Sequence, residues 1–212
     1  AVGWYWKGRP ERVDTGAEAR TIAVLPFVNM SGDPDNEYFS DGISEEILNV
    51  LASTPELRVA ARTSSFAFKG QAKEIPDIAR ELEVRMVLEG SVRRQGERVR
   101  ITAQLIDASN GFHLWSQTYD RELKDIFAIQ DEIAQAIAKE LDLKMGGAPG
   151  TGTAPQLATT PATDLVAYDL YLKGLTLWQA RGAANLYEAE RLFRAALARD
   201  PGFARAWAGL AL

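Results

Sequence analysis

The spacing of hydrophobic and polar residues changes along the chain, and each spacing predicts an element. The uninterrupted apolar run at residues 21–28 is typical of a strand buried on both faces, with Pro26 marking an edge, a bulge or the strand end. Apolar residues at steps of four over residues 38–53 predict an amphipathic helix that ends before Pro55. Further along, the pattern predicts a strand at 57–62, a short helix at 75–82, strands at 85–94, 98–107 and 112–120, and a helix at 124–142.

The three later strands predict a sheet with one face open to water. Residues 98–105 alternate strictly between polar and apolar side chains. Gly96 marks the first turn, and Asn110-Gly111 predicts a tight hairpin in which both turn positions have positive φ. Strands joined through helices are expected to be parallel, and strands joined by hairpins antiparallel. The order of elements therefore predicts an α/β fold with a mixed five-stranded sheet and helices packed on it.

A change of composition divides the chain. Residues 144–163 are rich in Gly, Pro, Thr and Ala and have almost no large apolar side chains, which predicts a flexible linker. We therefore expect a juxtamembrane or disordered segment at 1–20, the α/β domain at 21–143, the linker at 144–163 and a second, all-α unit at 164–212.

The second unit has the spacing of a tetratricopeptide (TPR) hairpin. Ala189, Phe193, Ala196 and Pro201 fall at intervals of four, three and five, which match the small, large, small and helix-stop positions of that repeat. Small residues let two helices approach while the large one fills the gap between them. A single hairpin cannot bury its own face, so we expect further repeats beyond Leu212. An unrelated helical hairpin is the open alternative.

The first residues have the character of a membrane boundary. Trp4, Tyr5 and Trp6 precede Lys7 and Arg9, and a membrane span often leaves the bilayer through aromatic and then basic residues. The span would have to lie before the first residue of the sequence. The terminus of a soluble chain is an equally open interpretation, and the topology stays undecided.

Composition excludes several kinds of site. The net charge is −5, so the chain as a whole lacks the positive field that binds nucleic acid. It contains no cysteine, which excludes disulfides, thiolate metal sites and cysteine nucleophiles. With a single histidine, His113, there is little material for imidazole metal clusters or Ser-His catalysis.

Two sequence patterns partly match a metal site or a catalytic motif, and neither match is complete. Asp33, Asp35 and Glu37 alternate as calcium-loop ligands do, but the glycine at the sixth position and the glutamate at the twelfth are missing. Ser64 and Ser65 have no lysine three residues later and no glycine elbow, and are expected in a loop or at a strand end. We therefore expect no enzymatic activity in this chain and no cofactor.

Two sets of residues are candidates for binding. Lys69, Arg93 and Arg94 are the candidates for binding a nucleotide or another anion in a crevice at the strand ends, with solvated turn residues as the alternative. A second set, expected to contact a protein or peptide partner on the concave face of the repeats, is Tyr168, Tyr171 and Trp178. An exposed edge of the sheet is the other surface expected to bind a partner.

Six ordered blocks resemble the TolB amino-terminal-like domain found in bacterial membrane-anchored adenylate cyclases and winged-helix transcriptional regulators. The resemblance covers residues 21–143, and residues 164–212 look like the TPR array that usually follows there. No ligand residues are carried over from the family. The blocks are Ile22-Ala-Val-Leu-Pro-Phe, Asn29-Met-Ser-Gly-Asp, Glu37-Tyr-Phe-Ser-Asp-Gly-Ile-Ser-Glu-Glu, Ser64-Ser-Phe-Ala-Phe-Lys-Gly, Val87-Leu-Glu-Gly-Ser-Val-Arg and Leu114-Trp-Ser-Gln-Thr-Tyr-Asp-Arg.

The resemblance implies a non-catalytic sensing and protein-interaction module of a larger signalling protein, on the periplasmic side of the inner membrane. Any cyclase activity would then belong to a part outside this chain. A small-ligand-binding domain and a freestanding periplasmic scaffold are the alternatives, and a cytoplasmic location stays open. The sequence leaves the partner and the oligomeric state undecided.

Overall fold

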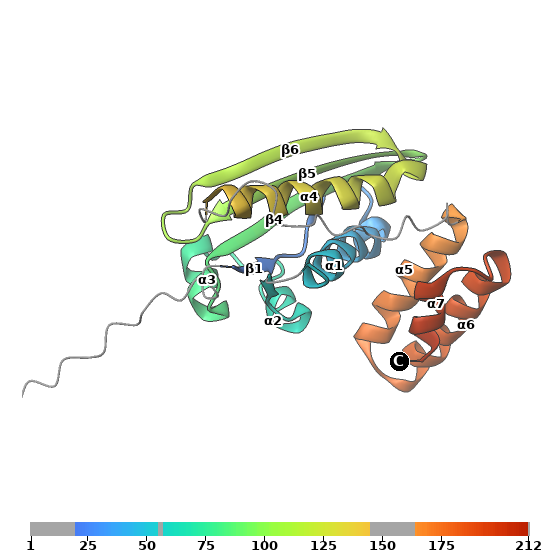
Figure 1. The fold of residues 1–212 in the computed structure, drawn as a ribbon. Coiled ribbons are helices and arrows are strands. Elements are labelled where there is room, and N and C mark those ends of the chain that lie inside the picture. Colours follow the sequence, from blue (N-terminus) through green and yellow to red (C-terminus); the bar gives the residue numbers. More distant parts are fainter. Residues whose placement is uncertain (1–19, 55–56, 145–163, 212) are drawn as a thin grey trace, which may run out of the picture.

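The computed structural model describes residues 20–54, 57–144 and 164–211, which form an α/β domain and a helical unit (Figure 1). The predictions for residues 1–19 and 145–163 lie outside these ranges. The strands are β1 (Thr21–Val24), β2 (Val28–Asn29), β3 (Arg58–Val59), β4 (Met86–Gln95), β5 (Arg98–Asp107) and β6 (His113–Glu122). The helices are α1 (Glu37–Ala52), α2 (Arg62–Phe66), α3 (Ile75–Leu82), α4 (Ile126–Lys144), α5 (Leu165–Ala180), α6 (Ala183–Arg199) and α7 (Ala204–Leu210), with short 3₁₀ turns at Pro34–Asn36 and Leu123–Asp125.

The sheet is mixed, as predicted, but has six strands and not five. Its order is β3-β1-β4-β5-β6, with β2 added beside β4. β1 is parallel to β3 and β4, and the two closing hairpins are antiparallel. The apolar run predicted as one strand is divided at Pro26, which has no amide to donate to a ladder. β1 therefore ends at Val24, and pairing resumes at Val28 as β2.

The hairpin between β5 and β6 is wider than predicted. The amide of Gly111 donates to the carbonyl of Asp107 at 2.8 Å. Gly111 has a φ of 74°, whereas Asn110 does not have a positive φ. The Oδ1 atom of Asn110 instead accepts a hydrogen bond from the amide of Phe112 at 2.8 Å. A loop over residues 108–112 thus replaces the two-residue turn.

Ser64 and Ser65 lie in helix α2, which the sequence interpretation did not include. That interpretation placed a strand over residues 57–62 and the two serines in a loop or at a strand end. The strand is shorter, because β3 covers only Arg58–Val59 and α2 begins at Arg62. This helix is five residues long, which is too short to give a recognisable apolar period.

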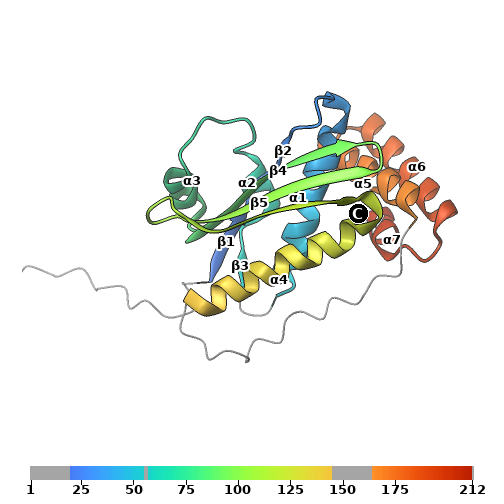
Figure 2. The same ribbon diagram turned by 90° about the horizontal axis from the view of Figure 1, so that it is seen from above.

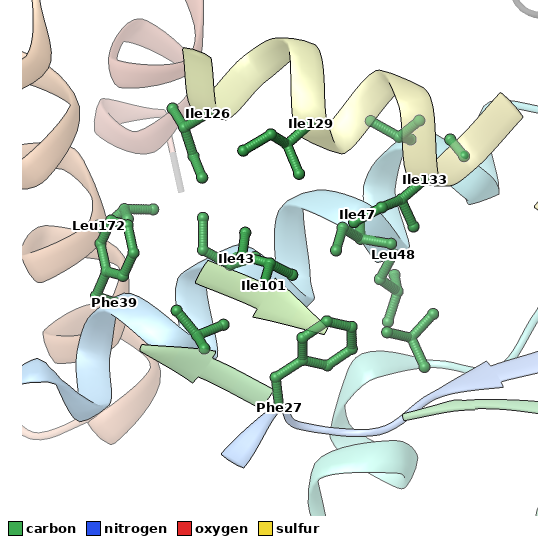
Figure 3. Close-up of a cluster of buried hydrophobic side chains, with 14 of the residues drawn as sticks. Phe27, Phe39, Ile43, Ile47, Leu48, Ile101, Ile126, Ile129, Ile133 and Leu172 are labelled. Carbon is green, nitrogen blue, oxygen red and sulfur yellow. The ribbon is translucent and has the colours of Figure 1, made fainter. Parts of the chain in front are cut away.

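The main core lies on one face of the sheet, beneath α1 and α4 (Figures 1 and 2). Isoleucines of both helices meet the apolar side chains of β5, as Figure 3 shows for Ile43, Ile101 and Ile129. These three residues have no exposed surface. The opposite face has a smaller cluster, in which α3 covers Leu25 and Val87. The open face predicted for the later strands is confirmed, because Arg98 to Gln104 alternate between exposed or partly exposed and buried positions.

The helical unit is built around one phenylalanine. Phe193 of α6 is buried, and two glycines lie against its ring. A Cβ atom on Gly174 would lie 2.7 Å from a ring carbon, and one on Gly209 would lie 2.9 Å away. Asp164 caps α5 by accepting hydrogen bonds from two amides at its start. The described residues of this unit form three helices, which share one packing centre.

Candidate functional site

Three clusters of polar contacts lie at the seam where α5 and α7 of the helical unit meet α1 of the α/β domain. Its apolar part is a close approach between Gly42 and Leu172, because a Cβ atom on Gly42 would lie 2.7 Å from a methyl carbon of Leu172. Leu172 also lies beside Phe39 in the core (Figure 3). The two units consequently share one continuous hydrophobic core.

A buried carboxylate lies at the centre of the seam. Glu46 projects from α1 with 1% of its surface exposed. The hydroxyl of Tyr171 donates to its Oε1 atom at 3.1 Å, and Arg205 of α7 forms an ion pair with Oε2. Burial raises the pKa of Glu46, although Arg205 opposes this effect. A buried charge of this kind depends on its partners, so Glu46 links the docking of α5 to that of α7.

A second polar cluster surrounds Asp169 of α5. Its carboxylate accepts hydrogen bonds from the Tyr38 hydroxyl at 2.6 Å and from Arg94 at 2.7 Å, and it pairs with Lys173 at 2.9 Å. Burial alone would raise the pKa of Asp169, but these three donors outweigh burial and hold the pKa below its usual value. Burial and the nearby carboxylate raise the pKa of Tyr38. This cluster joins β4, α1 and α5.

A third cluster lies at the other end of α5. Glu45 accepts a hydrogen bond from Arg62 at 2.8 Å and another from Gln179. Arg62 also donates to Gln179, and its guanidinium lies 3.9 Å from the centre of the Phe66 ring. The cluster ties helix α2, which contributes Arg62, to the seam.

The arrangement is suited to holding the two units together, because its side-chain contacts join α5 and α7 to α1. Within the described ranges, no group of three or more His, Cys, Asp or Glu side chains is placed to hold a metal ion. The part of the chain that the structure covers also has no helix with the length and apolar character needed to cross a membrane.

Tyr168 and Tyr171 do not lie on an open face. Tyr168 is 1% exposed and Tyr171 is 6% exposed. Gln130 of α4 donates to the Tyr168 hydroxyl at 3.0 Å, while Tyr171 bonds Glu46. The prediction that these tyrosines contact a partner is wrong, because they hold the helical unit to the α/β domain. Trp178 is partly buried, with the Arg181 guanidinium 4.4 Å from its ring, and its role in partner binding stays a prediction.

The structure does not bring Lys69, Arg93 and Arg94 together. Lys69 pairs with acidic residues of α1, and Arg94 belongs to the Asp169 cluster. The Arg93 side chain donates to the carbonyl of Met30 at 3.1 Å. Neighbouring residues of a strand point to opposite faces, which separates the two arginines. The three cations therefore do not form the predicted anion site.

The sequence interpretation missed Glu46, although the sequence contains a signal for it. Phe39, Ile43, Glu46 and Val50 follow one another at steps of four, three and four on the predicted amphipathic helix. A carboxylate at a position of the apolar face indicates a buried charge that needs a partner. The identity of that partner, Arg205, could not be read from the same pattern, because it lies 159 residues away.

Comparison with curated proteins finds a relative that is longer than this chain. The chain is 45% identical over 192 residues to "Putative adenylate cyclase 3" of Rhizobium meliloti (strain 1021). The matched region is 91% of this chain but only 32% of that protein, so the chain spans about a third of the length of its curated relative.

Solved structures with a related arrangement include two bacterial proteins. TolB from Acinetobacter baumannii matches with a TM-score of 0.44 and 16% identity, covering 57% of this chain and 28% of TolB. Lipoprotein GNA1162 from Neisseria meningitidis matches with a TM-score of 0.44 and 20% identity, covering 56% of this chain and 96% of the lipoprotein.

A family model covers most of the α/β domain. The model describes the second domain of HilA/YgeH-like transcriptional regulators and matches residues 18–136, which is more than half of the chain. The match runs from the segment before β1 into α4 and leaves the helical unit outside. The chain therefore belongs to the family of HilA/YgeH-like transcriptional regulator second domains.

Proposed function

We propose that this chain is a non-catalytic sensing and protein-interaction module within a larger bacterial signalling protein, and that its helical unit transmits the state of the α/β domain. The observation that carries this proposal is the seam, in which buried Glu46 joins both α5 and α7 to α1. A helical unit bound in this way responds to any displacement of α1. The regulator family and the similarity to a protein named as a cyclase support a role in signalling.

The helical unit is proposed to begin a TPR array. Gly174, Phe193 and Gly209 give the close packing of small residues against one large ring that such a repeat requires. α5 and α7 both contact α1 or its side chains, so the helical face toward the α/β domain is already occupied. A partner protein is therefore expected at a different surface.

The proposed surface for a protein partner is the outer edge of β6. This strand ends the sheet order, is ten residues long and contains no proline or lysine that would protect an edge from pairing. An added strand could bond its free backbone groups. The proposed location is the periplasmic side of the inner membrane. The aromatic and then basic residues at positions 4–9 are typical of a membrane boundary, whereas the basic residues by themselves favour the cytoplasmic side.

The test uses the full-length protein that contains this chain and measures its signalling output in cells. Asp169→Asn removes one of the negative charges at the seam with little change of shape, and it is expected to weaken the response to the stimulus. Asp120→Asn is the matched control, because Asp120 is also an ion-paired aspartate but lies on the open face of the sheet. Equal responses of both variants and wild type would contradict a relay through the seam.

The non-catalytic part of the proposal has its own test. The isolated chain, incubated with ATP and Mg²⁺, is expected to release no cyclic AMP and no inorganic phosphate. Release of either product in proportion to the amount of chain would show an enzyme and overturn this part.

A further inference from the structure

A cleft of about 400 Å³ opens at the carboxyl end of β1, on the face of the sheet opposite α1. α1 connects β1 to β3 over one face, whereas the connection from β3 to β4 passes through α3 on the other. Crevices beyond the carboxyl ends of parallel strands, where the connections diverge in this way, are the usual ligand sites of open α/β sheets. The volume lies within the range of small-molecule sites.

The division of the first strand at Pro26 shapes one wall of the cleft. Val24 of β1 pairs with Leu88 of β4, and Val28 of β2 pairs with Ser91. The chain therefore advances by four residues from β1 to β2 while β4 advances by three, which leaves one residue without a partner in the ladder. Phe27 lies in the core on the opposite face, where its ring lies against Gly90. The apolar wall of the cleft is formed by Leu25, Pro26, Val28, Phe68, Ile75 and Ile78.

The floor of the cleft is polar and has unused hydrogen-bonding capacity. Glu89 of β4 lies opposite Gln104 of β5, and Ser91 lies opposite Thr102. Thr102 bonds Thr118, while the Glu89 carboxylate forms neither a hydrogen bond nor an ion pair with any residue that the structure describes. Glu89 is only partly exposed. A ligand in the cleft could therefore bond this carboxylate without breaking an existing contact.

Two lysines, Lys69 and Lys73, also line the cleft, and the positive charge of each is already paired with a carboxylate. Lys69 pairs with Glu37 at 2.7 Å and with Asp41 at 2.6 Å, and Lys73 pairs with Glu81. The charge that lacks a counterion is therefore the negative charge of Glu89. This balance opposes the nucleotide or anion expected from the sequence and favours a ligand of positive charge.

We propose that this cleft binds a small organic cation, an amine with an aliphatic body. The ammonium group pairs with the Glu89 carboxylate and the Gln104 side-chain oxygen, and the carbon chain lies on the apolar wall formed by Leu25, Val28 and Phe68. The pairing is charge-assisted and burial of the carbon chain adds the hydrophobic contribution. This site is separate from the seam, so it does not depend on the proposed relay.

The probe is 1-aminopentane, titrated into the ¹⁵N-labelled 212-residue chain at low ionic strength and followed by NMR. We expect amide shifts confined to residues 69–71 and 89–91, and at least tenfold weaker binding by Glu89→Gln. Glu97→Gln is the matched control, because Glu97 lies in the exposed turn after β4 and outside the cleft. Glu89 is unpaired, so Glu89→Gln is expected to keep the fold, which its NMR spectrum reports directly.

Four results would overturn the proposal. They are an absence of shifts at millimolar 1-aminopentane, shifts located outside the cleft, equal affinities of Glu89→Gln and wild type, and binding of adenosine monophosphate at residues 89–91 in place of the amine. The last result would show that the cleft selects anions. None of these results bears on the seam, whose own test uses Asp169→Asn.

Discussion

The two faces of the sheet differ in what their side chains do, although both are built from the same strands. On β5, Val99, Ile101 and Ala103 point to the covered face and have no exposed surface. The residues between them remain exposed or partly exposed on the other face. The covered face holds the core and continues into the seam, whereas the open face keeps polar groups available to solvent and ligands. Buried and solvent-accessible side chains thus fall on alternate positions of one strand.

The ion pairs of the two faces differ in the same way. Arg98 and Arg100 pair with Asp120 on the open face, where water and salt screen them. Glu46 and Arg205 pair at the seam, where Glu46 is almost completely buried. An exposed pair contributes little to folding, while the loss of one partner from a buried pair leaves an unsatisfied charge.

The largest expected effect comes from shortening a side chain on the covered face. Ile101→Ala leaves a cavity between β5 and the helices, and should lower the free energy of unfolding by about 2–5 kcal/mol. Urea denaturation followed by circular dichroism measures this change. Thr102→Ala is the control on the next residue, which faces the open side, and a comparable loss from both variants would contradict the contrast between the faces.

The next effect in size is expected at the seam. Arg205→Ala removes the counterion of Glu46 and should cost about 2–3 kcal/mol, below the value for a fully buried pair because Arg205 is partly exposed. Arg191→Ala is the control, since Arg191 pairs only with Glu188 on the outer surface of α6. Identical urea midpoints for the two variants would show that Glu46 does not need Arg205.

A smaller effect is expected where the two units approach most closely. Gly42→Ala places a methyl group against Leu172, and overpacking of this kind costs about 1–3 kcal/mol. Leu172→Val removes one methylene from the opposing side, so the double variant should lose less stability than the sum of the two single variants. Strict additivity in urea denaturation would argue against direct contact between these positions.

The smallest effect is expected on the open face. Asp120→Asn weakens its pairing with Arg98 and Arg100, but all of these side chains are exposed to solvent. The urea midpoint should change by less than the measurement resolves, and any change should vanish at 1 M salt. A clear loss of stability that persists at 1 M salt would show that the pairing of Asp120 with the two arginines contributes to folding, contrary to the expectation.

Regular periodicity made much of the fold predictable. The strand at 98–107 has the predicted bounds, and the helix of α1 differs from its predicted bounds by one residue at each end. The errors occur where a local feature interrupts the period. Pro26 divides a strand, and α2 is too short to establish a helical period. Neither event changes the order of the longer elements.

The candidate site was less predictable than the fold. Tyr168 and Tyr171 have the aromatic character of partner-binding residues, but the same character suits a buried contact between two units. The choice between the two depends on whether α1 and α4 cover them, which only the tertiary structure shows. Lys69 presented the same difficulty, since its carboxylate partners lie on α1 and far away in sequence. A charge can be read from a sequence, but its counterion cannot.

The pairing of Glu46 with Arg205 also constrains how this protein can diverge. The two positions are 159 residues apart, and a lineage that loses Arg205 alone retains a buried carboxylate with no cation. Substitutions at the two positions should therefore occur together among relatives that keep the helical unit. Relatives that lack the unit should have an apolar or neutral residue at the position of Glu46. Covariation at this pair would thus identify relatives whose two units are docked in the same way.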